Sequence, residues 1–201
     1  MNNSSKTQAF TLVEVIIGIM VLSIVMFSIT VLTITVIQAN QANINKLTAY
    51  YLAQESLEGM RNVRDSNWSQ NHSWNSGGSI YSSFDWGADF DADGYYTVDY
   101  QANGSADTPP WTVSAWASEA SAMSAGVLYR AEDSAGDLFY VHDTTGFVDT
   151  TLTPYSRYLA LTYDPVEDIF QVTAIVFWEE HNRDREVQVS TQLSDWREGP
   201  I

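Results

Sequence analysis

The sequence has no cysteine and few basic residues. Without cysteine, the chain can form neither disulfide bonds nor thiolate metal sites. Only 9 Lys and Arg stand against 25 Asp and Glu, which gives a formal net charge of −16. A surface this acidic repels phosphate backbones, so we expect no nucleic-acid partner. The same surface suits divalent cations and keeps an exposed domain soluble.

The sequence also lacks common enzyme motifs. It contains no Gly-x-Ser-x-Gly, no P-loop and no dinucleotide-binding fingerprint. The three histidines, His72, His142 and His181, do not have the spacing of metal ligands. The acid pairs Glu167-Asp168 and Glu179-Glu180 fall in predicted turns, where a solvated side chain is the ordinary interpretation. We therefore predict that the chain is not an enzyme.

The most prominent feature of the sequence is one long apolar run near the amino terminus. The segment Val15–Ile37 contains neither a charged residue nor a proline. As a helix it spans about 34 Å, which is enough to cross the hydrocarbon core of a bilayer. Glu14 lies at the edge of this run. A carboxylate so close to hydrocarbon is costly, and by default it marks a functional site.

The residues before the apolar run indicate how to interpret it. Met1–Ala9 is short and polar, with Lys6 as its one basic residue. A secretory signal has a shorter apolar core, and its small-residue cleavage site comes after that core. Here the small residue, Ala9, comes before it. This order, with Phe-Thr-Leu-Val-Glu at 10–14, resembles the class III signal of type IV pilins and pseudopilins. The alternative is an uncleaved signal anchor.

The resemblance implies a processing site and an assembly site. In that family, a prepilin peptidase cuts before the phenylalanine and methylates the new amine, which corresponds here to cleavage between Ala9 and Phe10. Glu14 would then pair with the amine of Phe10 on a neighbouring subunit, and Thr11 would add a hydroxyl to this polar cluster. The alternative for Glu14 is a carboxylate at the cytoplasmic interface that reaches water.

The resemblance further implies a structural role, as a minor pilin or pseudopilin of a type IV pilus or a type II secretion-like filament. The implied partners are other pilin subunits, prepilin peptidase, the inner-membrane assembly platform and, before assembly, membrane lipid. The chain would cross the inner membrane once with its head outside, and then enter an extracytoplasmic filament or the cell surface. Two alternatives stay open. One is a filament-tip or membrane-anchored binding module of adhesin or receptor type, and the other is an anchored domain that does not polymerise.

Composition divides the chain into five segments. They are a leader at 1–9, a transmembrane and assembly half of a helix at 10–37, an amphipathic half at 38–65, an irregular region at 66–126 and a β-sheet head at 127–201. In the amphipathic half, apolar residues recur at steps of three and four, which predicts one helix from about Thr11 to about Arg64. Gly59 is the weak point of this half and leaves open a break followed by a separate helix.

The rest of the chain predicts β-structure. Two alternating segments, Tyr95–Tyr100 and Trp111–Trp116, lie within the irregular region. Later strands are expected at 127–130, 138–142, 157–163, 170–178 and 186–193. The strand at 170–178 should be central because both its faces are apolar, and the last should lie near an edge. We predict an α+β fold in which an antiparallel meander packs against the amphipathic half of the helix. The resemblance implies the same pilin-like arrangement.

One loop has a pattern that suggests calcium. Alternating acids and a glycine follow one another in the segment Asp89-Phe-Asp-Ala-Asp-Gly94, and this is what a calcium loop needs. The predicted ligands are Asp89, Asp91, Asp93, Tyr95 and Asp99. The last position of such a loop should be a glutamate and is a tyrosine here. The alternative is a solvated acidic turn, and no other cofactor is expected.

Overall fold

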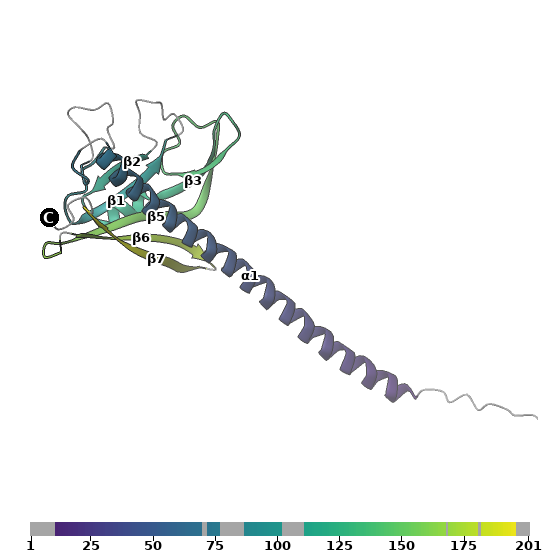
Figure 1. Cartoon of the computed structure of the whole chain (residues 1–201). Helices are drawn as coiled ribbons and strands as arrows, with labels where there is room; N and C mark the ends of the chain where they lie inside the picture. Colours follow the sequence, from purple (N-terminus) through teal and green to yellow (C-terminus); the bar gives the residue numbers. More distant parts are fainter. Residues whose placement is uncertain are drawn as a thin grey trace, which may run out of the picture. The chain divides into compact units, whose positions relative to one another are not determined.

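The computed structural model describes residues 11–69, 72–76, 87–101, 111–167, 169–180 and 182–195. Its first element is helix α1, Leu12–Ser69 (Figure 1). The chain divides into two compact units, of which one ends at Asn45 and the other, the head, begins at Lys46. The helix continues through Gly59 without a break and ends at Ser69 instead of near Arg64.

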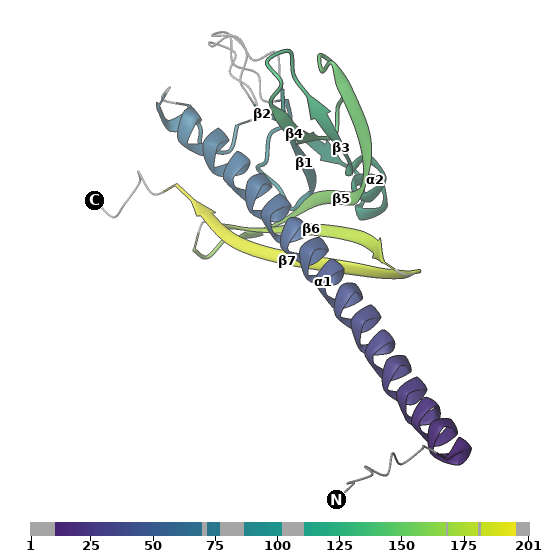
Figure 2. The ribbon, with the colours of Figure 1, turned by 90° about the vertical axis from the view of Figure 1, so that its right-hand side faces the viewer.

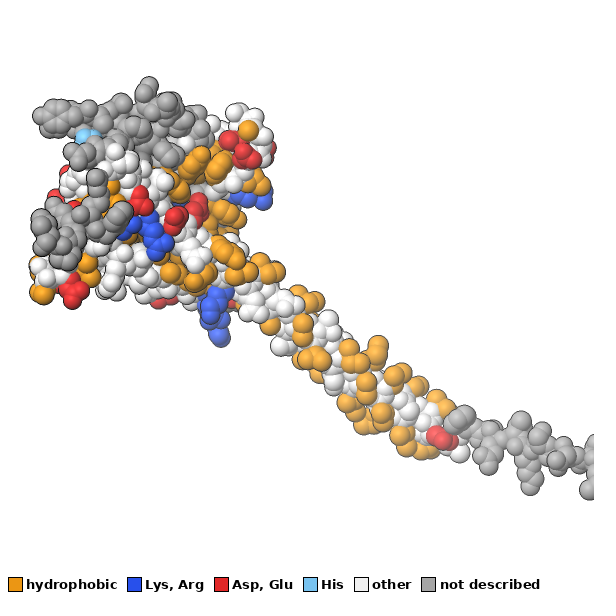
Figure 3. Space-filling model, in the orientation of Figure 1, with side chains coloured by type: hydrophobic (Ala, Val, Ile, Leu, Met, Phe, Trp, Pro, Cys, Tyr) orange, Lys and Arg blue, Asp and Glu red, His pale blue; other side chains and the backbone are white. Residues whose placement is uncertain are grey.

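The first unit contains the apolar half of α1, and its side chains are exposed from Leu12 to Gln41. By length and composition, α1 is the helix within the described residues that could cross a membrane. Hydrophobic side chains are spread along the whole visible length of this half, between polar side chains and backbone (Figure 3). Hydroxyl groups within it donate to the backbone carbonyl four residues earlier, at Ser23, Ser28, Thr30, Thr33 and Thr35. These bonds satisfy polar groups that hydrocarbon could not.

The head half of α1 packs one face into the core of the head. Its buried residues recur at steps of three and four and are Ala49, Leu52, Ala53, Ser56, Leu57, Gly59, Met60, Val63, Asn67 and Trp68. A Cβ atom on Gly59 would lie 2.8 Å from Val98 Cγ1 and 3.0 Å from Trp111 Cε3. Glycine is therefore needed here for the close approach of helix and sheet, and does not interrupt the helix.

Seven strands form one antiparallel sheet, which confirms the predicted α+β fold. They are β1 Gly94–Tyr100, β2 Trp111–Trp116, β3 Val127–Glu132, β4 Leu138–Val141, β5 Asp149–Asp164, β6 Ile169–Glu180 and β7 Arg183–Ser194. Each expected strand is present. The main difference is β5, which begins at Asp149 instead of Arg157.

The strand pairing differs from a simple meander. Strands β5, β6 and β7 do form one, as Figure 2 shows. On its other edge, however, β5 pairs with β3 through residues 149–156 and with β1 through residues 159–161. Two hairpins, β1–β2 and β3–β4, therefore attach to the same edge of one strand. The expectation of a meander was wrong here because β5 is long enough for both hairpins.

Both faces of the sheet are covered within the head. On one face, Val172, Ala174 and Val176 of β6 are buried in the main core with α1. On the opposite face, Ile175 belongs to a second cluster. These alternating contacts confirm that β6 is central, while β7 pairs with no described strand other than β6 and is an edge strand.

The second cluster forms under a short helix, α2, Glu119–Ala125, which the sequence analysis did not predict. Its Ala122 packs with Tyr158 and Ile175. The side chain of Ser118 accepts a hydrogen bond from the Ser121 N–H, and the Ser121 hydroxyl accepts one from the Ser118 N–H. This reciprocal cap stabilises the helix start. The region 66–126 thus holds more regular structure than its composition suggested.

Candidate functional site in the first turn of helix α1

The first turn of α1 is built around Thr11. The Thr11 hydroxyl accepts a hydrogen bond from the Glu14 N–H at 3.3 Å, and the Thr11 carbonyl accepts one from the Val15 N–H at 3.3 Å. Thr11 thus caps the helix, with the Thr-x-x-Glu spacing of a capping box. A carboxylate in this turn also complements the partial positive charge of the helix start. Ala9 and Phe10, the predicted processing site, lie outside the described residues.

Glu14 is isolated within the apolar half of the helix. It is the only charged residue from Leu12 to Asn45, and its side chain is exposed. Among the described residues, no hydrogen bond or ion pair to its carboxylate is seen. A carboxylate on an apolar surface favours a charge-assisted partner, because low dielectric strengthens the pair and makes the unpaired ion costly. The geometry therefore presents an acceptor for a cationic group.

The predicted calcium ligands are only partly brought together. Asp89, Asp91 and Asp93 are exposed around the loop. Burial raises the pKa of Tyr96, and the carboxylates of Asp91, Asp89 and Asp93 raise it further. One oxygen of Asp93 already accepts the Tyr163 N–H at 2.6 Å. The three acids thus share one region of the surface, where they act on the same tyrosine.

The other two predicted ligands belong to strand β1 and extend away from the loop. The Tyr95 ring packs beside the Tyr158 ring, with 6.2 Å between centroids. Asp99 is almost fully buried and accepts backbone N–H groups from His142 and Asp143. Within the described ranges, no group of three or more His, Asp or Glu side chains is arranged to hold a metal. Calcium binding remains a prediction.

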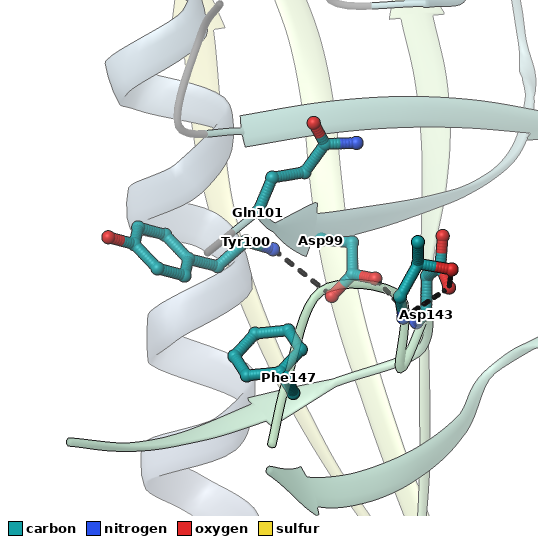
Figure 4. A pocket seen from close by; sticks show the side chains of 6 residues that line it. Asp99, Tyr100, Gln101, Asp143 and Phe147 are labelled. Carbon is teal, nitrogen blue, oxygen red and sulfur yellow. Dashed lines mark hydrogen bonds between the residues drawn. The ribbon is translucent and has the colours of Figure 1, made fainter. Parts of the chain in front are cut away.

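Asp99 instead connects strand β1 to the loop after β4, beside a cavity of about 100 Å³ (Figure 4). Its carboxylate lies 2.7 Å from the Asp143 nitrogen, and Asp143 in turn accepts the hydroxyl and the N–H of Thr145. Hydrogen bonding from the Thr145 hydroxyl and N–H lowers the pKa of Asp143, and burial opposes it weakly. These contacts hold the loop, and the sequence analysis did not identify them.

The sequence analysis also missed the most buried charge among the described residues of the head. Arg157 is 1% exposed and lies where β5 faces α1. Its guanidinium donates to the Leu52 carbonyl at 3.0 Å, to the Glu55 carboxylate at 3.0 Å and to the Val98 carbonyl at 3.3 Å. One signal was available in the sequence. Along a strand, Arg157 falls on the same side as the apolar Leu159, which lies in the core.

Comparison with known proteins matches the amino-terminal segment. A family model described as the prokaryotic N-terminal methylation motif matches residues 4–35. No curated protein and no solved structure gives a significant match to the chain. The matched residues include positions 4–9 of the leader, the capped first turn with Glu14 and most of the apolar half of α1. The chain therefore carries the class III signal of type IV pilins and pseudopilins.

Proposed function

We propose that this chain is a minor pilin or pseudopilin that assembles from the inner membrane into an extracytoplasmic filament. The observation that carries the proposal is the coincidence of the methylation motif with an isolated carboxylate. The motif covers residues 4–35, and Glu14 is the only charged residue of helix α1 within that range. Processing by prepilin peptidase and assembly with other pilins follow from the motif.

The assembly contact proposed is an ion pair between subunits. Cleavage after Ala9 would create an amine at Phe10, four residues before Glu14 on the same chain. In a bundle of such helices, the carboxylate of one subunit meets the amine of its neighbour. The pair is directional in a low dielectric, so it sets the register of neighbouring helices even where its net contribution to stability is small. Thr11, which caps the turn, holds Glu14 in helical geometry.

The proposed topology places the amino terminus in the cytoplasm and everything after Ile37 outside. The methylation motif at residues 4–35 supports this, because this orientation is the one that the resemblance to type IV pilins implies. The whole chain has a net charge of −16, and nearly all of its charged residues lie in the head. Such an acidic surface suits an exposed and soluble domain.

Among filament types, we favour a short pseudopilus or a position at the filament tip. The segment Val15–Ile37 has no proline, and the structure has an uninterrupted helix there. Proline breaks the backbone ladder of a helix, so a membrane helix without it has no built-in point of local melting. A long pilus whose extrusion needs such melting fits this chain less well.

Replacing Glu14 by alanine tests the proposal. The variant should be made, processed and inserted at near-normal levels, because removing a carboxylate from a membrane helix makes insertion easier. It should be missing from sheared filaments, since the lost contact exists only between subunits. Glu14→Asp should be intermediate, and Glu167→Ala, an exposed acid of the head, should assemble normally.

Two results would contradict the proposal. Normal entry of Glu14→Ala into filaments would show that this carboxylate is not an assembly contact. A mature amino terminus other than Phe10, measured by mass spectrometry of the purified protein, would contradict processing at the predicted site. An intact Met1 would instead support the uncleaved signal anchor.

A further inference from the structure

Strand β7, Arg183–Ser194, is the long open edge of the described sheet. It pairs with β6 along one side and with no other described strand. The opposite edge, at β2, is partly occupied, because Gly87 bridges to Val113 and the Ala88 N–H donates to the Val113 carbonyl. The third edge strand, β4, has only four residues. Of the three edges, β7 therefore offers the longest row of backbone donors and acceptors.

The last eight residues of this edge, Val187–Ser194, carry no charge. Charged residues occupy positions 183–186, but none occurs from Val187 to Ser194. Natural sheets usually guard an exposed edge with charged side chains, proline, bulges or a covering element, since an unguarded edge recruits another strand. Here the residues are Val-Gln-Val-Ser-Thr-Gln-Leu-Ser, which have no proline and favour strands. In a chain this acidic, an uncharged edge of that length indicates a binding surface.

A groove runs beside this edge. It has a volume of about 510 Å³ and lies between the outer side of α1 and β7. Its lining includes Gln54, Leu57, Glu58, Arg61, Val189 and Ser190. Arg61 donates hydrogen bonds to the Glu58 carboxylate at 3.1 Å and to the Thr191 hydroxyl at 2.8 Å. The positive charge of Arg61 and the negative charge of Glu58 at the rim of the groove therefore neutralise each other. A strand added to β7 would place alternate side chains in this groove, and the compensated rim favours uncharged ones.

An inverted second copy does not fit this edge. Helix α1 and β7 run in the same direction, because Arg61 contacts Thr191 and Trp68 contacts Asp195. Antiparallel pairing of two β7 strands would therefore invert the head half of one helix, Lys46–Ser69, which is about 36 Å long. The eight helical residues 38–45 span only about 12 Å. They cannot connect an inverted head to the same membrane.

An upright second copy does not fit either. It would present β7 to β7 as parallel strands related by a two-fold axis along their length. That symmetry places each residue opposite itself. In a parallel pair of strands, a residue whose N–H and C=O point at the neighbouring strand bonds to the two residues on either side of the one opposite it. The residue opposite must therefore point its own N–H and C=O away, so two identical residues related by the two-fold axis cannot face each other. The other edges of an upright copy are the occupied β2 and the short β4.

We propose that the β7 edge of this chain binds an extended, uncharged segment of a different protein by strand addition. Backbone hydrogen bonds to β7 provide the affinity, and the groove beside α1 selects the side chains. The inference goes beyond the proposed function, because it concerns the head and does not depend on Glu14.

Site-specific photo-cross-linking in cells that make the full chain with its native neighbours tests this. A benzoylphenylalanine probe replaces Gln188, Ser190 or Gln192, whose side chains are exposed on β7. Gln171 on the central strand β6 is the matched control, since it is exposed and pairs directly with Gln192. Cross-linked peptides are then mapped by mass spectrometry in membrane and sheared-filament fractions.

The expected result is one partner whose cross-linked position moves by two residues for each two-residue step along β7. The yield should exceed that at Gln171 several-fold, and a further Ser190→Lys change should lower the yield at Gln188. Three results would overturn the inference: no product from β7, attachment points that do not move in register, or a product with a second copy of this chain.

The same fractions separate the two proposals. Stepped cross-links in membranes from a chain that never enters filaments would support strand addition and contradict filament assembly. A chain that enters filaments but gives no stepped cross-links would support filament assembly and contradict strand addition.

Discussion

The ion pair between Glu55 and Arg157 should be one of the strongest single contacts between α1 and the sheet of the head. In a soluble fragment, residues 38–201, we expect Glu55→Ala to lower the free energy of unfolding by about 3 kcal/mol. Removing one partner of a buried ion pair costs about 3–5 kcal/mol, because the other charge stays buried. Arg157 is 1% exposed, whereas the Glu55 side chain is 33% exposed, which places the cost at the lower end of that range.

Removing the arginine instead should cost less. In Arg157→Met, an apolar chain of similar length fills the space, and Glu55 can turn to water. The carbonyls of Leu52 and Val98 each lose a donor, at about 1 kcal/mol for each bond, so the total is about 2 kcal/mol. In this background, Glu55→Ala should cost almost nothing. The coupling between the two sites is then about 3 kcal/mol, which is at the upper end for residues in contact.

Urea unfolding followed by tryptophan fluorescence measures these values by linear extrapolation. The matched control is Glu58→Ala, one turn along α1, whose partner Arg61 is 42% exposed. An exposed pair of this kind contributes about 0.2–1 kcal/mol. The reasoning fails if Glu55→Ala costs no more than the control, or if it costs the same with and without Arg157.

Three further changes test other parts of the head in the same fragment. Gly59→Ala should destabilise it by about 1 kcal/mol in urea unfolding, since overpacking against Trp111 at about 2 kcal/mol exceeds the helix propensity gained, about 1 kcal/mol. Thr145→Val should lower Tm at neutral pH. Hydrogen bonds from Thr145 lower the pKa of Asp143, so this stabilisation is present above the unfolded pKa of about 3.9. It should be lost, and the Tm difference with it, as the pH falls through the lower folded pKa. Millimolar calcium should raise Tm by binding the loop 89–93, because a ligand at a hundredfold excess over Kd adds about 2.7 kcal/mol to the free energy of unfolding. Equal Tm values in calcium and chelator would leave a solvated acidic turn.

The elements of the fold that could be predicted from the sequence are those with a local pattern. Apolar steps of three and four placed α1 through Gly59, and alternation placed β1 and β2 within about a residue of their observed limits. The apolar faces of β6 indicated a central strand, which the two core clusters confirm. In each case, the signal lies within a few residues of the element that it describes.

The pairing of strands could not be predicted in this way. Residues 159–161 of β5 pair with the start of β1, more than sixty positions earlier, and nothing near either segment indicates the other. Helix α2 was missed for a different reason. With seven residues and a serine in place of the usual acid of a capping box, it is too short for a periodic pattern. Its position depends on Tyr158, whose hydroxyl donates to Glu119 at 2.5 Å.

Glu14 and Arg157 differ in how far the sequence alone could predict their role. Glu14 stands alone in an apolar run, and its isolation is visible in the sequence because no neighbouring residue could compensate it. Arg157 also lies among apolar residues, but its compensation comes from Leu52, Glu55 and Val98, which only the folded head brings near. Under the proposed function, the first charge finds its partner on a neighbouring subunit, whereas the second has its partners within the head. A substitution that spares folding but blocks assembly should therefore be found at Glu14, and substitutions that destabilise the head should be found at Arg157 and, more strongly, at its partner Glu55.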